Sequence, residues 1–235
     1  MELKKIIVCF LVAIFLTSCS TAKPKTPLQP DVSDIASFIQ LNQKPERKNM
    51  VASWYGPGFH GKLTASGEVY DMYSFSAAHK TLPFGTILCV KNQFSGRAAA
   101  ITINDRGPFI DGRDLDLSYK AAERLGIVHP GTSKVKVSIL GRDMRYVKYI
   151  RLSGTVDSGP YTVQVAAFID AEKAVRLKKS LELEYKAVYL KPAEIKGTQV
   201  YRVRVGKFGN KSSAIDLAKT LAQVGYNTLI TKYDS

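Results

Sequence analysis

The stretch Ile103-Asn104-Asp105-Arg106-Gly107-Pro108-Phe109 runs from an apolar strand into a polar turn. Aliphatic and β-branched residues favour strands, whereas Asn, Asp, Gly and Pro favour turns. Short β-type runs punctuated by Gly and Pro lie on both sides of this stretch, at 86–91, 97–103 and 135–140. One segment, 117–125, has helical spacing, with Gly126 placed to end the helix. We therefore predict an all-β domain with one small helix over residues 49–140.

The C-terminal part of the chain alternates strands with helices. Tyr-Thr-Val-Gln-Val-Ala-Ala-Phe-Ile at 161–169 is echoed by Tyr-Arg-Val-Arg-Val-Gly-Lys-Phe-Gly at 201–209. The predicted strands are 161–168, 187–190, 200–205 and 228–232, and the predicted helices are 171–183 and 212–224. The order β-α-β-β-α-β is a ferredoxin-like pattern, and we expect both helices on one face of the sheet. This second domain should cover 159–235, after a linker over 141–158.

The first residues have the pattern of a targeting segment. Lysines precede an apolar run over 6–16, which is shorter than the roughly 20 residues that a membrane-spanning helix needs. The run ends in Leu16-Thr17-Ser18-Cys19, which resembles the bacterial lipobox, in which the Cys is acylated and becomes the N-terminus. We expect a lipoprotein signal peptide over 1–18, a lipid anchor on Cys19 and a tether over 19–48.

Composition limits the partners that the chain can have. The 235 residues carry a net charge of +14, which suggests an anionic partner such as nucleic acid, an acidic polymer or a membrane surface. Because no run of Lys and Arg exceeds a pair, the charge is not concentrated as in a duplex-binding arm, and we expect no nucleic acid partner. No cluster of His, Cys and carboxylates has metal-ligand spacing, so we expect neither a metal nor a cofactor.

Several motifs of the first domain together resemble one family. They are Ala52–Gly56, Thr64–Glu68, Asp71-Met72, Ala77–Thr86 and Ile103–Phe109. In this order they resemble the double-psi β-barrel of the rare lipoprotein A family, which are septal-ring lytic transglycosylases. The C-terminal repeat resembles the SPOR domain, which binds glycan strands stripped of their stem peptides. The resemblance implies a six-stranded double-psi β-barrel followed by a ferredoxin-like SPOR domain.

The same resemblance implies an activity and a location. A lytic transglycosylase is a lyase that cleaves the MurNAc–GlcNAc bond without water and leaves 1,6-anhydromuramoyl ends. The family implies denuded peptidoglycan as the substrate and divisome proteins as partners. It also implies a position on the periplasmic face of the outer membrane, with enrichment at the septum. Ser20 after the lipobox Cys favours the outer membrane. The alternative is a non-catalytic peptidoglycan-binding lipoprotein of the division site.

One carboxyl group can act first as the acid and then as the base of this reaction, provided that it holds a proton near neutral pH. Gly67-Glu68-Val69-Tyr70-Asp71 supplies two carboxylates, and repulsion between them would keep one protonated if both face one groove. By resemblance Glu68 is the candidate acid/base, with Asp71 and His79 as supporting polar residues. The alternatives are a solvated turn for the two carboxylates and a hydrogen-bonded, half-buried histidine for His79.

Asp105 competes with Glu68 for the catalytic role. Because Arg106 is its neighbour, we expect a lowered pKa for Asp105, which suits electrostatic stabilisation of an oxocarbenium-like state better than proton donation. The alternative is a structural role, since Asn-Asp-Arg-Gly-Pro also has the composition of a turn held by side-chain hydrogen bonds.

Candidate binding residues occur in both domains. Trp54, Tyr55 and Phe59 could stack on sugar rings, although aromatic residues at the start of a strand belong to the core just as often. In the second domain, Gln164 and Arg202 fall where the SPOR family contacts glycan from its exposed sheet face. Arg202 and Arg204 alternate with valines and should share one face of the sheet.

Overall fold

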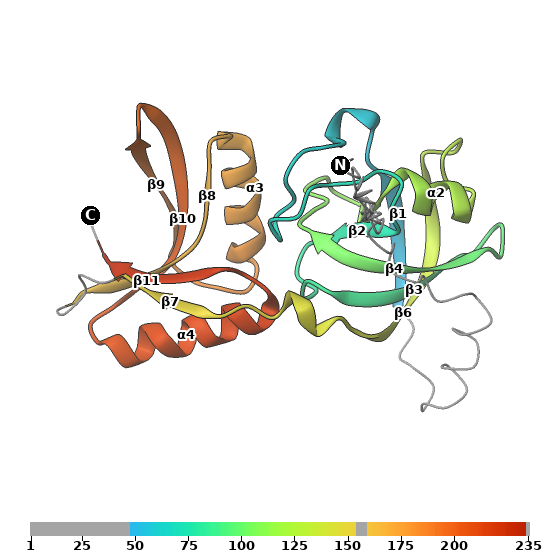
Figure 1. The fold of residues 1–235 in the computed structure, drawn as a ribbon. Coiled ribbons are helices and arrows are strands. Elements are labelled where there is room, and N and C mark those ends of the chain that lie inside the picture. The colour runs from blue at the N-terminus through green and yellow to red at the C-terminus, as the bar shows by residue number, and fades with distance from the viewer. Residues whose placement is uncertain (1–47, 154–158, 234–235) are drawn as a thin grey trace, which may run out of the picture.

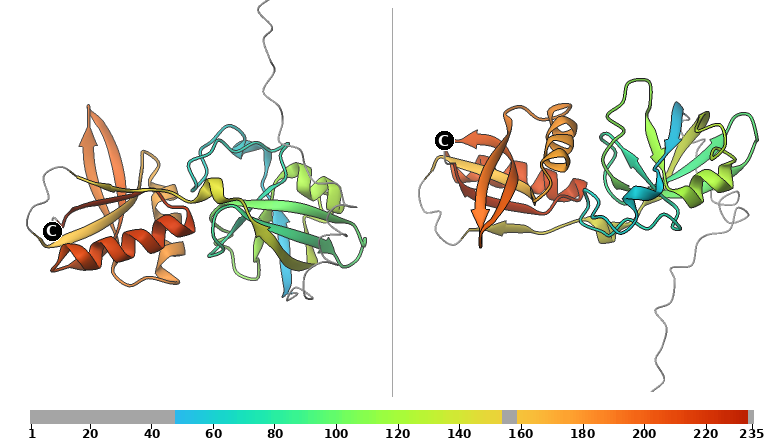
Figure 2. Two further views of the ribbon diagram at one scale, coloured as in Figure 1. Left: turned by 60° about the horizontal axis from the view of Figure 1, so that its bottom comes forward. Right: turned by 90° about the horizontal axis from the view of Figure 1, so that it is seen from above.

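The computed structural model describes residues 48–153 and 159–233, which form two domains lying side by side (Figures 1 and 2). The predicted signal peptide, the Cys19 anchor and nearly all of the tether lie outside these residues. Within the two described ranges, no helix is long and apolar enough to cross a membrane.

The first domain, residues 48–142, is a closed barrel of six strands, which confirms the predicted architecture. The strands are β1 (Lys48–Trp54), β2 (Ser76–His79), β3 (Thr86–Asn92), β4 (Ala98–Asp105), β5 (Leu115–Leu117) and β6 (Thr132–Arg142). Around the barrel their order is β1-β5-β2-β4-β3-β6, and β1 with β5 and β2 with β4 pair in parallel. Alternate residues of β3 and β4, such as Leu88 and Ile101, fill the interior.

The small helix of the barrel, α2 (Tyr119–Leu125), begins later than the sequence suggests. Leu117 belongs to β5 instead, and the Ser118 side chain caps the helix by accepting a 3.2 Å hydrogen bond from the Ala121 N–H. Gly126 ends the helix at φ 73°, the left-handed conformation that the sequence predicts for it.

The second domain has the predicted order of strands and helices. Its elements are β8 (Tyr161–Phe168), α3 (Ala171–Glu182), β9 (Val188–Ile195), β10 (Thr198–Phe208), α4 (Lys211–Val224) and β11 (Thr228–Lys232). Apolar residues of β8 and β10 pack with those of α3 and α4 in one core, so both helices cover one face of the sheet. The two echoed segments form β8 and β10, which are paired neighbours in the sheet.

The region predicted as a linker contains regular structure. β6 continues to Arg142, a 3-10 turn η2 (Met144–Tyr146) follows, and β7 (Ile150–Leu152) joins the edge of the second sheet, parallel to β11. Tyr146 and Ile150 pack against the core of the second domain. These apolar contacts explain why the segment is structured despite its polar composition.

A loop of the barrel penetrates the second domain. Phe84 is fully buried in the second domain's core, its ring lies 5.1 Å from that of Tyr226, and its N–H donates to the Val224 oxygen at 3.0 Å. Gly225 lies against it, and a Cβ there would approach the Tyr146 oxygen to 2.9 Å. Because Gly225 also has φ 108°, the close approach of the two domains requires glycine at this position.

Arg106 connects the polar turn of the barrel to the same interface. Its Nε donates to the Tyr226 hydroxyl at 2.6 Å, its Nη1 donates to the Leu82 oxygen at 2.9 Å, and its guanidinium carbon lies 3.7 Å from the centre of the Phe84 ring. The residue is only 6% exposed. A buried guanidinium needs such hydrogen-bond and aromatic partners, so Arg106 is a structural contact between the domains.

Candidate active site

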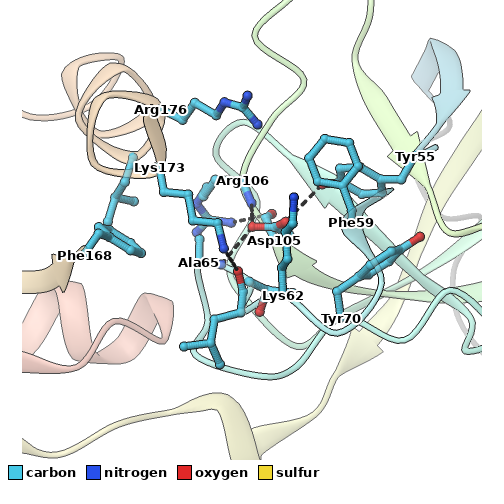
Figure 3. Close-up of a pocket in the computed structure, with 13 residues that line it drawn as sticks. Tyr55, Phe59, Lys62, Ala65, Tyr70, Asp105, Arg106, Phe168, Lys173 and Arg176 are labelled. Atoms are coloured by element: carbon cyan, nitrogen blue, oxygen red, sulfur yellow. Dashed lines mark hydrogen bonds between the residues drawn. The ribbon is translucent and has the colours of Figure 1, made fainter. Parts of the chain in front are cut away.

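Asp105 ends β4 at the opening of the barrel. It pairs with Ala78 of β2, beside a register shift, and such irregularities redirect the side chains around them. Its Oδ1 accepts hydrogen bonds from the Ala65 N–H and the Arg106 N–H, both at 2.8 Å, and its Oδ2 accepts one from the Tyr55 hydroxyl at 3.1 Å (Figure 3). The carboxylate is therefore held in one orientation.

The environment of Asp105 raises its pKa. Burial is the largest cause, and it outweighs the hydrogen bonds from Ala65, Arg106 and Tyr55 and the Arg106 charge, all of which lower the pKa. The expectation of a lowered pKa for Asp105 is wrong, because burial of the carboxyl group outweighs the Arg106 charge. The guanidinium itself binds Tyr226 and Leu82, and only the backbone N–H of Arg106 binds the carboxylate. A carboxyl group in this setting is suited to hold a proton.

Aromatic rings line the cavity into which Asp105 opens. The Tyr55 ring lies 5.4 Å from Phe59, in the 3-10 turn η1 (Pro57–Phe59), and 5.1 Å from Tyr70. The cavity has a volume of about 60 Å³. Burial, and next the charge of Asp105, raises the pKa of Tyr55, so its hydroxyl remains a hydrogen-bond donor.

Glu68 lies on the surface beside this cavity and is not among the residues that line it. Its Oε2 accepts hydrogen bonds from Asn104 Nδ2 at 3.0 Å and from the Tyr146 hydroxyl at 2.7 Å. The Asn104 contact brings Glu68 to the residue before Asp105, so both carboxylates meet the end of β4. Sequence reasoning missed Tyr146, because it lies in the segment predicted as a linker.

The structure gives Asp71 and Glu68 separate partners. Asp71 is exposed, accepts a 3.0 Å hydrogen bond from the Tyr73 N–H and lies 3.8 Å from His60 Nδ1. The arrangement of Asp71 is that of a solvated turn. The hypothesis of a mutually repelling pair in one groove therefore gains no support from these contacts.

His79 ends β2 as a half-buried acceptor. Its Nδ1 accepts hydrogen bonds from the Thr81 N–H at 3.1 Å and the Leu82 N–H at 3.0 Å. Burial first, and the Arg106 charge second, lowers the pKa of His79 to about 4. The imidazole is therefore neutral at physiological pH and stabilises the loop that leads to Phe84.

Replacing His79 by Asn should remove a pH-dependent part of the stability. In the folded protein the pKa of His79 is about 4, whereas unfolded histidine has a pKa of about 6.5, so stability should rise between these values by up to ~1.4 kcal/mol per pH unit. Asn can still accept both N–H groups but does not titrate. Urea unfolding across this pH range should give a smaller slope for His79→Asn than for wild type. The exposed His129 provides the control: an equal change for His129→Asn would contradict the assignment.

A larger groove adjoins the Asp105 cavity and has a volume of about 670 Å³. The three candidate sugar-stacking residues all line it: Trp54, Tyr55 and Phe59. Trp54 is half-buried and packs edge-on against Tyr119, with ring centres 5.7 Å apart. The groove also contains the ion pair of Arg113 with Asp116, at 2.8 Å. A groove with aromatic walls and polar groups can accommodate an extended carbohydrate.

The candidate glycan contacts of the second domain differ in exposure. Gln164 in β8 lines a third hollow, of about 410 Å³, together with the 63–67 loop of the barrel. Arg202 in β10 is partly buried and pairs with Ala167 of β8. Arg204 is 3% exposed, so it is not part of a solvated face. In the described residues, no group of three His, Cys, Asp or Glu side chains could hold a metal ion.

Comparisons with known proteins identify both domains. Residues 47–137 match the lytic transglycolase family with a double-psi β-barrel, and residues 157–232 match the SPOR domain. The chain is 35% identical over 195 residues to the endolytic peptidoglycan transglycosylase RlpA of Vibrio cholerae, and the match covers 83% of this chain and 72% of that protein. This chain belongs to the RlpA family. The RlpA protein of Helicobacter pylori strain J99 is 34% identical over 206 residues, which are 80% of this chain and 64% of that protein.

Membership of the RlpA family confirms the resemblance inferred from the barrel motifs and the repeat. In this member of the family, the fold brings Tyr55 and Asp105 together and places Trp54 in the adjoining groove. Glu68 lies next to them through Asn104. The side chains of His79 and Asp71 accept hydrogen bonds from backbone N–H groups two residues further along the chain.

Proposed function

We propose that this chain is an endolytic peptidoglycan lytic transglycosylase in which Asp105 is the general acid and base. The observation that carries the proposal is a carboxyl group whose pKa is raised by burial, in an aromatic cavity beside a long groove. The names of the RlpA relatives, endolytic peptidoglycan transglycosylases, support the reaction.

The geometry suits one group acting twice. Protonated Asp105 gives its proton to the glycosidic oxygen as the bond to muramoyl C1 breaks, which leaves an oxocarbenium-like C1 and an ionised carboxylate. The N–H groups of Ala65 and Arg106 and the Tyr55 hydroxyl stabilise that ionised form. The C6 hydroxyl of the same muramoyl residue then attacks C1 and returns a proton to Asp105. The product is a 1,6-anhydro ring, and no water is consumed.

Glu68 remains the competing candidate for the acid. Its position favours a supporting role, because the side chain is exposed and does not line the cavity into which Asp105 opens. Its hydrogen bonds to Asn104 and Tyr146 connect the end of β4 to η2. We propose that Glu68 positions this end of the strand, while Trp54 and Tyr55 bind sugar rings.

The cellular setting follows from the sequence and the second domain. The lipobox-like Cys19 supports a lipoprotein anchored on the periplasmic face of the outer membrane, and the SPOR match supports enrichment at the septum and binding of denuded glycan. Gln164 and Arg202 are the proposed glycan contacts of the second domain. Divisome proteins are the proposed further partners.

Incubation of residues 20–235 with amidase-treated sacculi tests the reaction. Mass spectrometry of the soluble products should detect 1,6-anhydromuramoyl ends, because the C6 hydroxyl replaces water as the nucleophile. New reducing ends instead would indicate hydrolysis. Binding without any new ends would favour the alternative, a non-catalytic glycan-binding lipoprotein.

A further inference from the structure

Helix α3 of the second domain forms the wall that faces the opening of the barrel. Tyr55, Phe59 and Arg106 line both the Asp105 cavity and the larger groove, whereas Phe168 and the 63–65 segment line both the cavity and the third hollow. The three hollows therefore adjoin one another. Residues of α3 line the cavity and the larger groove, so both lie between the two domains. Figure 3 shows α3 on the opposite side of the cavity from the barrel.

Cationic side chains occupy the side of α3 that faces this groove. Lys173, Arg176 and Lys179 follow each other at three-residue spacing, which places them along one side of the helix. Lys173 Nζ donates to the Leu63 oxygen at 3.0 Å, and Figure 3 shows Lys173 and Arg176 pointing toward the barrel. The row spans about 9 Å at the 1.5 Å rise of a helix, a length comparable to that of a disaccharide.

Acidic groups neutralise this row only in part, although Glu172 also lines the larger groove. Glu172 pairs with Arg176 at 3.2 Å, whereas Lys173 and Lys179 have no ion-pair partner in the described part of the chain. In the adjoining cavity Lys62 lies over the Phe59 ring, 5.3 Å from its centre. Arg106 adds a buried Nη2 that has no hydrogen-bond partner among the described residues. Cationic side chains therefore outnumber carboxylates along the cavity and the groove together, which favours an anionic ligand.

A muramoyl residue of the proposed substrate carries a negative charge on its lactyl group only when no stem peptide is attached. The lactyl group of a muramoyl residue is an amide while a stem peptide is attached, and it is a carboxylate once the peptide has been removed. We infer that Arg176 and Lys179 of α3 bind the lactyl carboxylates of peptide-free muramoyl residues in the groove, so that the second domain contributes directly to substrate selection by the barrel. This inference rests on the proposed function.

The double variant Arg176→Gln/Lys179→Gln tests this inference. Its kcat/KM and its affinity for peptide-free strands should fall about tenfold, the effect of losing roughly one charge-assisted hydrogen bond. Strands whose lactyl carboxylates have been converted to methylamides should bind wild type and variant equally. The control Lys178→Gln/Lys219→Gln also removes two cations, each paired with an acidic residue in its own helix and neither lining the groove, and it should behave as wild type. Glu172→Gln, which frees Arg176, should act in the opposite direction.

Affinity for peptide-free strands is measured by calorimetry in proteins that also carry Asp105→Asn, so that binding is observed without cleavage. This measurement separates the inference from the proposed function. Failure of wild type to form anhydro ends would refute the reaction, while the binding comparison would still decide the role of α3. Equal affinity of the double variant and wild type for peptide-free strands would overturn the inference. An equal loss of affinity for free and methylamidated strands would also overturn it, because the recognised group would not be the carboxylate.

Discussion

Asp105→Asn should lower the rate of 1,6-anhydromuramoyl end formation by about 10²–10⁴-fold, the usual cost of removing a general acid. Asn matches the size of Asp and can still accept the N–H bonds from Ala65 and Arg106, so the fold should survive. Only the titratable proton is lost. Quantification of anhydro ends over time, with circular dichroism as the check on folding, measures the effect.

Glu68→Gln is the matched comparison for this prediction. It retains an acceptor for Asn104 and Tyr146, so we expect a smaller loss of activity than for Asp105→Asn. The opposite order, with Glu68→Gln inactive and folded Asp105→Asn active, would make Glu68 the acid, as the motif resemblance suggests. In wild type, activity should fall as pH rises through the pKa of Asp105, and burial moves this fall to higher pH because it raises that pKa.

Phe84→Ala should destabilise the second domain by about 3–5 kcal/mol, the range for removal of a buried Phe side chain. Phe84 is 0% exposed and belongs to the core formed by α3, α4 and their sheet, although the chain places it in the barrel. Its loss also removes the aromatic partner of the Arg106 guanidinium. Urea unfolding followed by near-ultraviolet circular dichroism should show the lower midpoint.

Phe94→Ala is the control for Phe84→Ala. Phe94 belongs to the same barrel but is 80% exposed, so its replacement should change stability by no more than about 0.5 kcal/mol. If Phe84→Ala also changes stability by only that amount, Phe84 does not stabilise the interface between the domains.

Much of this fold could be predicted from the sequence because the signals are local. The strands 161–168 and 228–232 agree with β8 and β11 at both ends, since alternation and β-branched residues act within each strand. Gly126 could be assigned as the helix end because a left-handed residue is an intrinsic requirement there. The short strand β5, Leu115–Leu117, has too few residues to give a periodic signal.

The candidate site could be predicted only in part, because its decisive properties depend on three-dimensional contacts. The motifs identify Asp105 and Glu68 as the competing carboxylates, but adjacency in sequence suggests that Arg106 lowers the pKa of Asp105. The direction of a long side chain is not encoded by its neighbours, and here Tyr226, more than a hundred residues later, receives the guanidinium. Tyr146 gave no signal, because its contact with Glu68 depends on how η2 packs.

Arg106 takes part in two different sets of contacts. Its backbone N–H orients the Asp105 carboxylate, and its guanidinium is bound by Tyr226 and Phe84 at the interface between the domains. Movement of the second domain away from the barrel would withdraw the partners of that guanidinium and loosen the residue that orients the acid. Under the proposed mechanism, the docked arrangement would thus help to hold the proton donor, and we expect cleavage competence to be a property of the assembled chain more than of the barrel by itself.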